Sequence, residues 1–240
     1  MSTPFDEKAV EELCQIGVKA MKISGFESSD YRFVEMVAST KLPLIISIGI
    51  DFPRDGIEKI LDITYKHGNL LTLLHCNNAY PTPIFDSNLK TINFLKDICG
   101  SAGLSDHTTS VVIPSIAVAI GANTIEKHFT LDKTLDGPDH AFALDPEELK
   151  QMVTNIRDTE ISLKTRGNSL TKSEKPFVVG KRSIVSNQKI KKGEIFTKDN
   201  ITTKRPYLYG NIPAFEYENI LGKKANSDYN IDEFIKNVDF

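Results

Sequence analysis

The chain has 240 residues, of which 40% are apolar and 25% charged, and its formal net charge is −3. This composition is typical of a globular protein, and the lack of a basic excess argues against nucleic-acid binding. Because the longest apolar run, residues 42–50, is far shorter than the roughly 20 residues that cross a bilayer, and the N-terminus has no signal-peptide pattern, the sequence predicts a cytoplasmic protein that does not enter a membrane.

The first predicted element is a helix over residues 4–17, which Asp6 caps. After it, short β-rich runs alternate with longer amphipathic stretches at intervals of about 20 to 30 residues, which is typical of parallel βα units. The predicted strands are residues 18–24, 42–49, 70–76, 102–106 and 123–129. The helices that follow them are predicted over residues 31–39, 56–67, 88–99, 111–121 and 146–164.

These five units predict an α/β domain over residues 1–163 in the form of a partial TIM-type (β/α)8 barrel. The strands are nearly continuous apolar runs, as in parallel sheets that are covered on both faces. Five units and the stub at residues 1–4 are fewer than the eight units that close such a barrel. We therefore expect a barrel whose first strands are missing.

A second, smaller domain is predicted after the barrel. Residues 164–180 are polar and contain Gly and Pro, which is typical of a linker. From 181 to 240 the β-rich runs are short, at 182–186, 194–197 and 201–206, and turn signals separate them. This pattern predicts a compact, mostly β module.

The three cysteines, Cys14, Cys76 and Cys99, have no CxxC spacing and are odd in number. Both features argue against a disulfide framework and against a structural zinc site. We expect reduced thiols in the core.

Polar residues gather where each predicted strand ends, the edge on which barrel enzymes build their sites. Glu126 and His128 lie two apart on the last strand and should face one way, while Lys127 faces the other. His107 ends the preceding strand, so two imidazoles should lie at similar height. Such a pair can bind a divalent metal if water or a carboxylate completes the coordination. The ligand types do not distinguish manganese, zinc, iron and cobalt. Two core histidines are the alternative.

Other strand ends offer hydrogen-bonding groups to a ligand. Asn78 and Tyr80 share a face and suit a polyhydroxylated ligand, although a structural turn would explain them equally well. Thr3, Lys22 and Ser47 are three donors at three strand ends that could bind phosphate, since no glycine-rich phosphate loop is present. Lys22 could instead form a Schiff base, which keeps a lysine aldolase open as an alternative.

One further histidine, His67, precedes Gly68 at the end of a predicted helix. The sequence predicts a helix-capping role for it rather than a place in a site.

The ordered motifs STPFD, KISGFE, HCNNAYPTP, GLSDHT, TIEKHFTLDK, GPDHAFALDPEEL and GKRSIVSNQKIKKGEIFTKDNITTKRP resemble the sialic acid synthase family. Residues 181–240 are similar to its C-terminal antifreeze-like domain, also called the SAF domain. The resemblance runs essentially from end to end. It implies condensation of phosphoenolpyruvate with an N-acetylated amino sugar, such as N-acetylmannosamine, to give a nine-carbon sialic acid and phosphate.

The resemblance also implies roles for individual residues. His107 and His128 would bind a divalent metal, manganese in this family. The implied catalytic residues are Lys22, Glu27 and Glu126. The positions that match phosphoenolpyruvate contacts are Thr3, Lys22 and Ser47, and those around the sugar are Glu27, Asn78, Tyr80 and Asp139. Arg205 matches an arginine that reaches the neighbouring subunit's site and binds the N-acetyl group, which implies a domain-swapped homodimer.

Two departures from the family pattern stand out. Gly25 stands where the family usually has a serine, three residues after Lys22, and Ser24 lies one position earlier. We therefore expect one phosphate contact to be lost or shifted. We also expect a different acceptor sugar, such as a precursor of legionaminic or pseudaminic acid. The chain also lacks the family's first two strands and most of the third. We expect the chain to be a fragment of a longer reading frame, a barrel that a partner completes, or a decayed paralogue. The alternative to a synthase is a non-catalytic remnant that binds a sugar or a partner.

Overall fold

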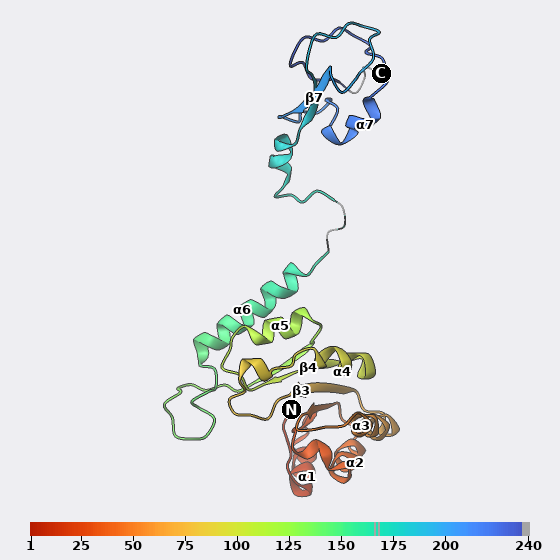
Figure 1. Cartoon of the computed structure of the whole chain (residues 1–240). Helices are drawn as coiled ribbons and strands as arrows, with labels where there is room; N and C mark the ends of the chain where they lie inside the picture. The colour runs from red at the N-terminus through yellow and green to blue at the C-terminus, as the bar shows by residue number, and fades with distance from the viewer. Residues whose placement is uncertain (166, 168, 237–240) are drawn as a thin grey trace. The chain divides into compact units, whose positions relative to one another are not determined.

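The computed structural model describes residues 1–165, 167 and 169–236. The chain divides into two compact units, Met1–Lys164 and Thr165–Phe240 (Figure 1). None of the described helices combines the length and the apolar content that a bilayer-crossing segment needs.

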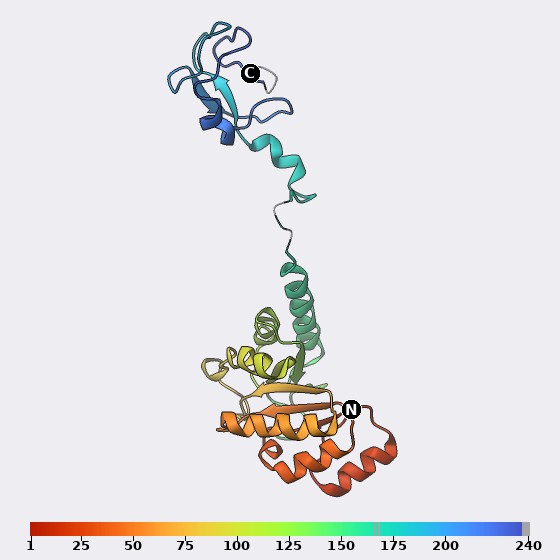
Figure 2. The same cartoon turned by 90° about the vertical axis from the view of Figure 1, so that its right-hand side faces the viewer.

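Unit 1 alternates strands and helices in the predicted order (Figures 1 and 2). The strands are β1 (Met21–Ile23), β2 (Leu44–Ile48), β3 (Leu71–Cys76), β4 (Ala102–Asp106) and β5 (Thr124–Lys127). The helices are α1 (Glu7–Ile16), α2 (Tyr31–Ser39), α3 (Arg54–His67), α4 (Thr91–Cys99), α5 (Ile113–Ala119) and α6 (Pro146–Ser162), with short 3-10 helices η1 (Glu27–Ser29) and η2 (Ile84–Asp86). All five strands are parallel and lie in the order β1-β2-β3-β4-β5. The predicted βα units are confirmed.

Local signals explain where the helices begin and end. The carboxylate of Asp6 accepts a hydrogen bond from the Ala9 amide at 2.7 Å and caps α1, as predicted. Asp145 and Glu148 form a capping box at the start of α6. Gly68 ends α3 in the left-handed region, with φ of 76°, which glycine adopts without a steric penalty.

The two faces of the sheet carry different side chains. The face toward the helices is apolar and buried, as at Ile46 and Leu73. The alternate positions face inward and are polar near the strand ends, as at Lys22 and Glu126. These two residues lie on the first and last strands, yet Lys22 Nζ is 2.9 Å from Glu126 Oε2. In a flat sheet the strands that carry them would be about 19 Å apart, so the sheet curls into a half-barrel.

Unit 2 has its own apolar core and little regular structure. Its elements are η3 (Lys175–Gly180), β6 (Ser183–Ser186), β7 (Ile201–Lys204), η4 (Ala214–Glu216) and α7 (Tyr217–Ile220). β6 and β7 pair antiparallel. The prediction of a strand at 194–197 is wrong. Ile195 makes only an isolated bridge to Lys224, and the Phe196 side chain lies in the core. The segment predicted as a plain linker contains η3.

The predicted core position of the cysteines holds for Cys76 and in part for Cys99, which packs against the apolar core, but not for Cys14. Cys76 is buried, Cys99 is partly buried, and Cys14 is exposed. Cys14 lies on α1, whose one buried residue is Val10, so most of that helix faces solvent.

Candidate active site

A cavity of about 400 Å³ lies at the carboxyl ends of the parallel strands of unit 1. It is lined by Thr3, Phe5, Lys22, Ser24, Gly25, Cys76, Asn78, Tyr80, Ser105, His107, Glu126, Lys127 and His128. Most of the site residues predicted from the sequence therefore come together in one place. Period-two alternation explains this, because one face of each strand supplies the lining.

Charges pair at the base of the cavity. The Lys22 ammonium, with a side chain only 10% exposed, forms an ion pair with Glu126. The hydroxyl of Ser105 on β4 donates a hydrogen bond to the same carboxylate oxygen at 2.7 Å. Glu126 is therefore held from two sides, and the Lys22 cation faces the interior of the cavity.

The two predicted metal ligands lie next to each other. The rings of His107 and His128 are 5.2 Å apart, centroid to centroid. His107 Nδ1 is 2.6 Å from the carbonyl oxygen of Asn77, and since a carbonyl only accepts, Nδ1 must donate and Nε2 keeps a free lone pair. Burial lowers the pKa of His107, and the neighbouring His128 adds to this effect, while the Asn77 hydrogen bond opposes it.

Two further predicted residues surround this pair. The Tyr80 ring lies 4.0 Å from that of His107 and 5.7 Å from that of His128, and burial raises the pKa of its phenol. Asp139 Oδ2 is 3.6 Å from His128 Nδ1. A carboxylate beside Nδ1 orients the His128 imidazole so that Nε2 points away from Asp139.

This donor set fits a divalent ion held by two imidazoles. Within the described parts of the chain, no group of three or more His, Cys, Asp or Glu side chains is arranged to hold a metal. An ion at His107 and His128 would therefore keep several positions open for water or for substrate oxygens, as catalytic rather than structural sites do.

Besides Asp139, three predicted residues are not among those that line the cavity. Ser47 on β2 is fully buried, and its hydroxyl has no hydrogen-bond partner among the described residues. Glu27 lies in η1, where its carboxylate accepts a hydrogen bond from the Ser24 hydroxyl. Arg205 follows β7 in unit 2, and its side chain is exposed.

Asn78 lies in a slot made by two glycines. A β-carbon at Gly49 would come 2.0 Å from Asn78 Oδ1, and one at Gly25 would come 2.9 Å from the same atom. Both distances are below those of real β-carbon contacts, so the Asn78 amide would have to move to make room for a side chain at either position. The departure at Gly25 therefore has a structural counterpart, because a serine there would push against Asn78.

The sequence did not single out three residues that shape the site. Cys76 lines the cavity, and burial raises the pKa of its thiol to about 11, so it is an uncharged wall. Lys127 borders the cavity, but its ammonium lies on the other face of the sheet, where Nζ is 2.7 Å from Asp106 Oδ2 and the two side chains are 4% and 2% exposed. Lys127 also donates to the Thr108 carbonyl. This ion pair joins β4 to β5 directly behind His107 and His128.

The remaining histidines have structural partners. His140 Nδ1 lies 2.7 Å from the Thr130 hydroxyl. His67 ends α3 as predicted, but it contacts Glu35 at 2.8 Å, and the helix is capped by the backbone of Gly68 instead. His75 is buried on the helix side of β3, 2.8 Å from the Ser87 carbonyl.

His75 should make stability depend on pH. Burial lowers its pKa, so the folded protein keeps it neutral at a pH where the unfolded chain already binds a proton. Stability should therefore fall as the pH drops below the ordinary histidine value of about 6.5. The variant His75→Gln keeps a donor for the Ser87 carbonyl but does not titrate. We therefore expect it to lose less unfolding free energy than the parent chain between neutral and mildly acidic pH, as measured by urea unfolding. An equal loss in both proteins would contradict this assignment.

The sequence matches the profile of the NeuB family over residues 1–168 and that of the SAF domain over residues 181–240. The chain belongs to the NeuB family. Among its relatives is the N,N'-diacetyllegionaminic acid synthase of Campylobacter jejuni, 40% identical over 98% of this chain and 71% of the relative. The pseudaminic acid synthase of the same species is 40% identical over all of this chain and 69% of the relative.

A solved structure supports the same relationship. The spore coat polysaccharide biosynthesis protein of Bacillus subtilis superposes with a TM-score of 0.65 at 31% identity, over 98% of this chain and 71% of that one. The NeuB-family fold of this chain is thus a curled parallel half-barrel followed by an SAF region. The two Campylobacter relatives are named as synthases of related sugar acids.

Proposed function

We propose that this NeuB-family chain condenses phosphoenolpyruvate with an N-acetylated amino sugar to give a nine-carbon sugar acid and phosphate. The supporting observation is the strand-end cavity, which is lined by a buried lysine, the half-buried glutamate paired with it, and two adjacent imidazoles. Relatives named as legionaminic and pseudaminic acid synthases favour a diacetamido acceptor over N-acetylmannosamine. In this reaction C3 of phosphoenolpyruvate bonds to the sugar aldehyde carbon, water adds at C2, and phosphate leaves.

The chain's own residues have distinct tasks in this proposal. The Lys22 cation and the Thr3 hydroxyl bind the anionic groups of phosphoenolpyruvate, and the buried hydroxyl of Ser47 supports them. Glu126, held by Lys22 and Ser105, can take up or give a proton beside the reacting carbons. Around the sugar, Asn78, Tyr80, Glu27 and Asp139 offer hydrogen bonds that fix its orientation.

His107 and His128 are the proposed ligands of a manganese ion. When bound, such an ion supplies Lewis-acid polarisation of the sugar aldehyde. The hydrogen bond from His107 to Asn77 and the carboxylate of Asp139 beside His128 hold both rings in position without it.

A Schiff base at Lys22 is the alternative chemistry for this cavity, because the lysine side chain lines it. Borohydride reduction in the presence of pyruvate tests this point, because an adduct at Lys22 would favour an aldolase over the synthase.

Phosphate release from phosphoenolpyruvate tests the proposed function. The purified chain is supplied with manganese and with N-acetylmannosamine or a diacetamido sugar, and release that needs both sugar and metal is the expected result. The preferred sugar then identifies the product class. A folded chain that releases no phosphate with any of these sugars would contradict the proposal and favour a non-catalytic binding role.

Replacing Gly49 should act through Asn78. In Gly49→Ala the new methyl group displaces the Asn78 amide, so we expect KM for the amino sugar to rise by about tenfold with a smaller change in kcat. Gly180→Ala is the matched control, because a β-carbon there meets nothing within 4 Å. Equal KM values for the two variants would show that Asn78 does not take part in sugar recognition.

We propose that Arg205 serves the site of a second copy in a domain-swapped homodimer. Arg205→Ala should raise KM for the amino sugar, since its task is recognition. Mixing Arg205→Ala chains with inactive His107→Ala chains should restore activity at about a quarter of the sites, because only one site of each mixed dimer is intact. If mixing restores nothing, the arginine does not act across subunits.

A further inference from the structure

Two buried charges of unit 1 have no part in the proposed reaction. Lys127 follows the cavity residue Glu126 on β5, but its ammonium lies 2.7 Å from Asp106 Oδ2 on the other face of the sheet. Replacement of a buried ion pair by apolar residues of similar volume is often neutral or stabilising, so stability alone does not explain such a pair. The Lys127–Asp106 pair therefore calls for a second task.

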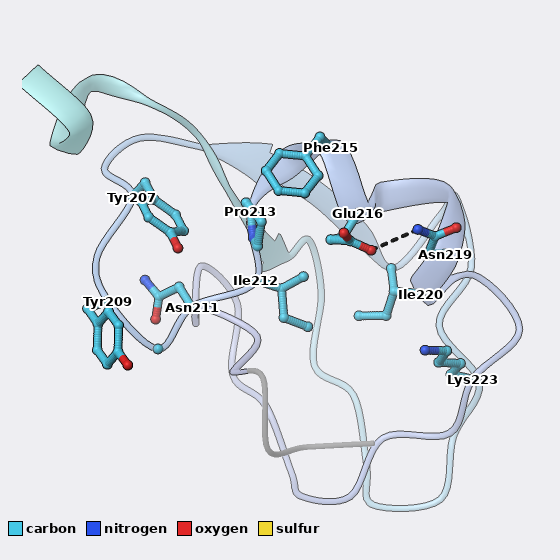
Figure 3. Close-up of a pocket in the computed structure, with 11 residues that line it drawn as sticks. Tyr207, Tyr209, Asn211, Ile212, Pro213, Phe215, Glu216, Asn219, Ile220 and Lys223 are labelled. Carbon is cyan, nitrogen blue, oxygen red and sulfur yellow. Dashed lines mark hydrogen bonds between the residues drawn. The ribbon is translucent and has the colours of Figure 1, made fainter. Parts of the chain in front are cut away.

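A cavity of about 530 Å³ in unit 2 shows the more ordinary arrangement of a charged group. There the Glu216 carboxylate accepts a hydrogen bond at 2.7 Å from Asn219, which lies three residues along the chain and is exposed (Figure 3). Lys127 and Asp106, in contrast, are 21 residues apart and directly opposite in the β4–β5 register. Their ion pair connects two strands rather than neighbours in one segment.

The Lys127 ammonium holds the turn that carries His107. It donates a hydrogen bond to the Thr108 carbonyl as well as to Asp106. The Asp106 carboxylate accepts from the Thr108 amide at 2.9 Å and from the Thr108 hydroxyl at 3.2 Å. Asp106 and Thr108 are 3% and 2% exposed. One buried cation thus fixes the backbone on both sides of His107.

The same lysine directly precedes His128 in the chain. Side chains alternate along a strand, so the Lys127 ammonium lies behind the sheet while the His128 ring lines the cavity. A single side chain therefore links the backbone that carries one imidazole to the backbone that carries the other. The link lies on the opposite face of the sheet from both rings.

This link matters because the two imidazoles have no further protein ligand to set their spacing. Among the residues that the structure describes, no cluster of three or more metal-binding side chains includes them. Four protein ligands around an ion would fix one another, whereas two depend on the groups behind them. The 5.2 Å separation of the His107 and His128 rings is therefore set by the scaffold.

We propose that Lys127 is a positioning residue, which holds His107 and His128 at the spacing that a divalent ion requires. It acts through Asp106 and the Thr108 backbone and touches neither the ion nor the substrates. This inference rests on the metal role proposed above for the two histidines.

Manganese titration of the full chain by electron paramagnetic resonance tests the inference without turnover. Lys127→Met combined with Asp106→Leu removes the link but leaves no buried charge without a partner, so the double variant should still fold. We expect its manganese affinity to fall by about 10–100-fold, which is the usual cost of losing a group that orients metal ligands. In the metal-free chain, the Nδ1 proton that His107 donates to Asn77 should exchange faster with water in NMR spectra of the double variant.

Thr108→Val is a milder variant that keeps the ion pair. It removes only the hydroxyl that bonds to Asp106, so manganese affinity should fall by about threefold while the chain folds as the parent does. Lys133→Met is the control, because it breaks an ion pair with Glu148 that does not line the cavity. Its manganese affinity should equal that of the parent.

The possible results separate this inference from the proposed function. Parent-like manganese affinity in the double variant or in Thr108→Val would overturn the positioning role alone. A parent chain that binds no manganese would refute the proposed metal role, and this inference with it.

Discussion

Replacing either His107 or His128 by alanine should lower sugar-dependent phosphate release by more than about 100-fold, because loss of a group that merely orients a metal ligand already costs 10–100-fold. The two rings lie 5.2 Å apart and no third side chain of the described residues can replace one of them. Each variant should therefore also lose manganese affinity, which titration by electron paramagnetic resonance measures directly.

His67→Gln is the control for this experiment. It removes an imidazole that contacts Glu35 between two helices, away from the cavity, so phosphate release and manganese affinity should stay at the parent level. Undiminished manganese affinity in both His107→Ala and His128→Ala would refute the metal assignment even if activity is lost.

Replacing Lys127 by methionine should unfold unit 1 far more easily. Its ion pair with Asp106 is almost completely buried, so the variant leaves a buried carboxylate without a counter-ion. We expect a loss of about 3–5 kcal/mol, which lowers the melting temperature of unit 1 by roughly 6–20 °C.

Two further variants define the origin of this loss. Lys133→Met is the matched control, because its ion pair with Glu148 is about one-third exposed on both sides and should contribute less than about 1 kcal/mol. Adding Asp106→Leu to Lys127→Met removes the stranded charge and should recover much of the stability. If the double variant is no more stable than the single one, buried charge is not the cause.

Local patterns were enough to predict most of unit 1. Side chains alternate along any strand, so the inward direction of Lys22, Glu126 and His128 follows from their positions alone. The same rule places Asp106 and Lys127 on one face of the sheet, but it does not give the β4–β5 register in which they are direct neighbours. The ion pair was missed for this reason.

Other features depend on tertiary structure and could not be predicted. Ser47 lies in register with Leu74 and is buried away from the cavity lining, which only the packed sheet decides. The slot for Asn78 depends on how closely the backbone approaches at Gly49. In unit 2, Phe196 fills the core while Ile195 is 49% exposed and makes only an isolated bridge, so the composition of residues 194–197 suggested a strand that does not form.

The contact between Lys22 and Glu126 makes the glutamate an internal competitor for anions. A phosphate or carboxylate group that binds the lysine either shares its ammonium with the Glu126 carboxylate, 2.9 Å away, or displaces that carboxylate. In both cases the negative charge of Glu126 lowers the affinity for the anion. Where the anion displaces Glu126, the electrostatic link between the first and last strands of the half-barrel runs through the bound ligand.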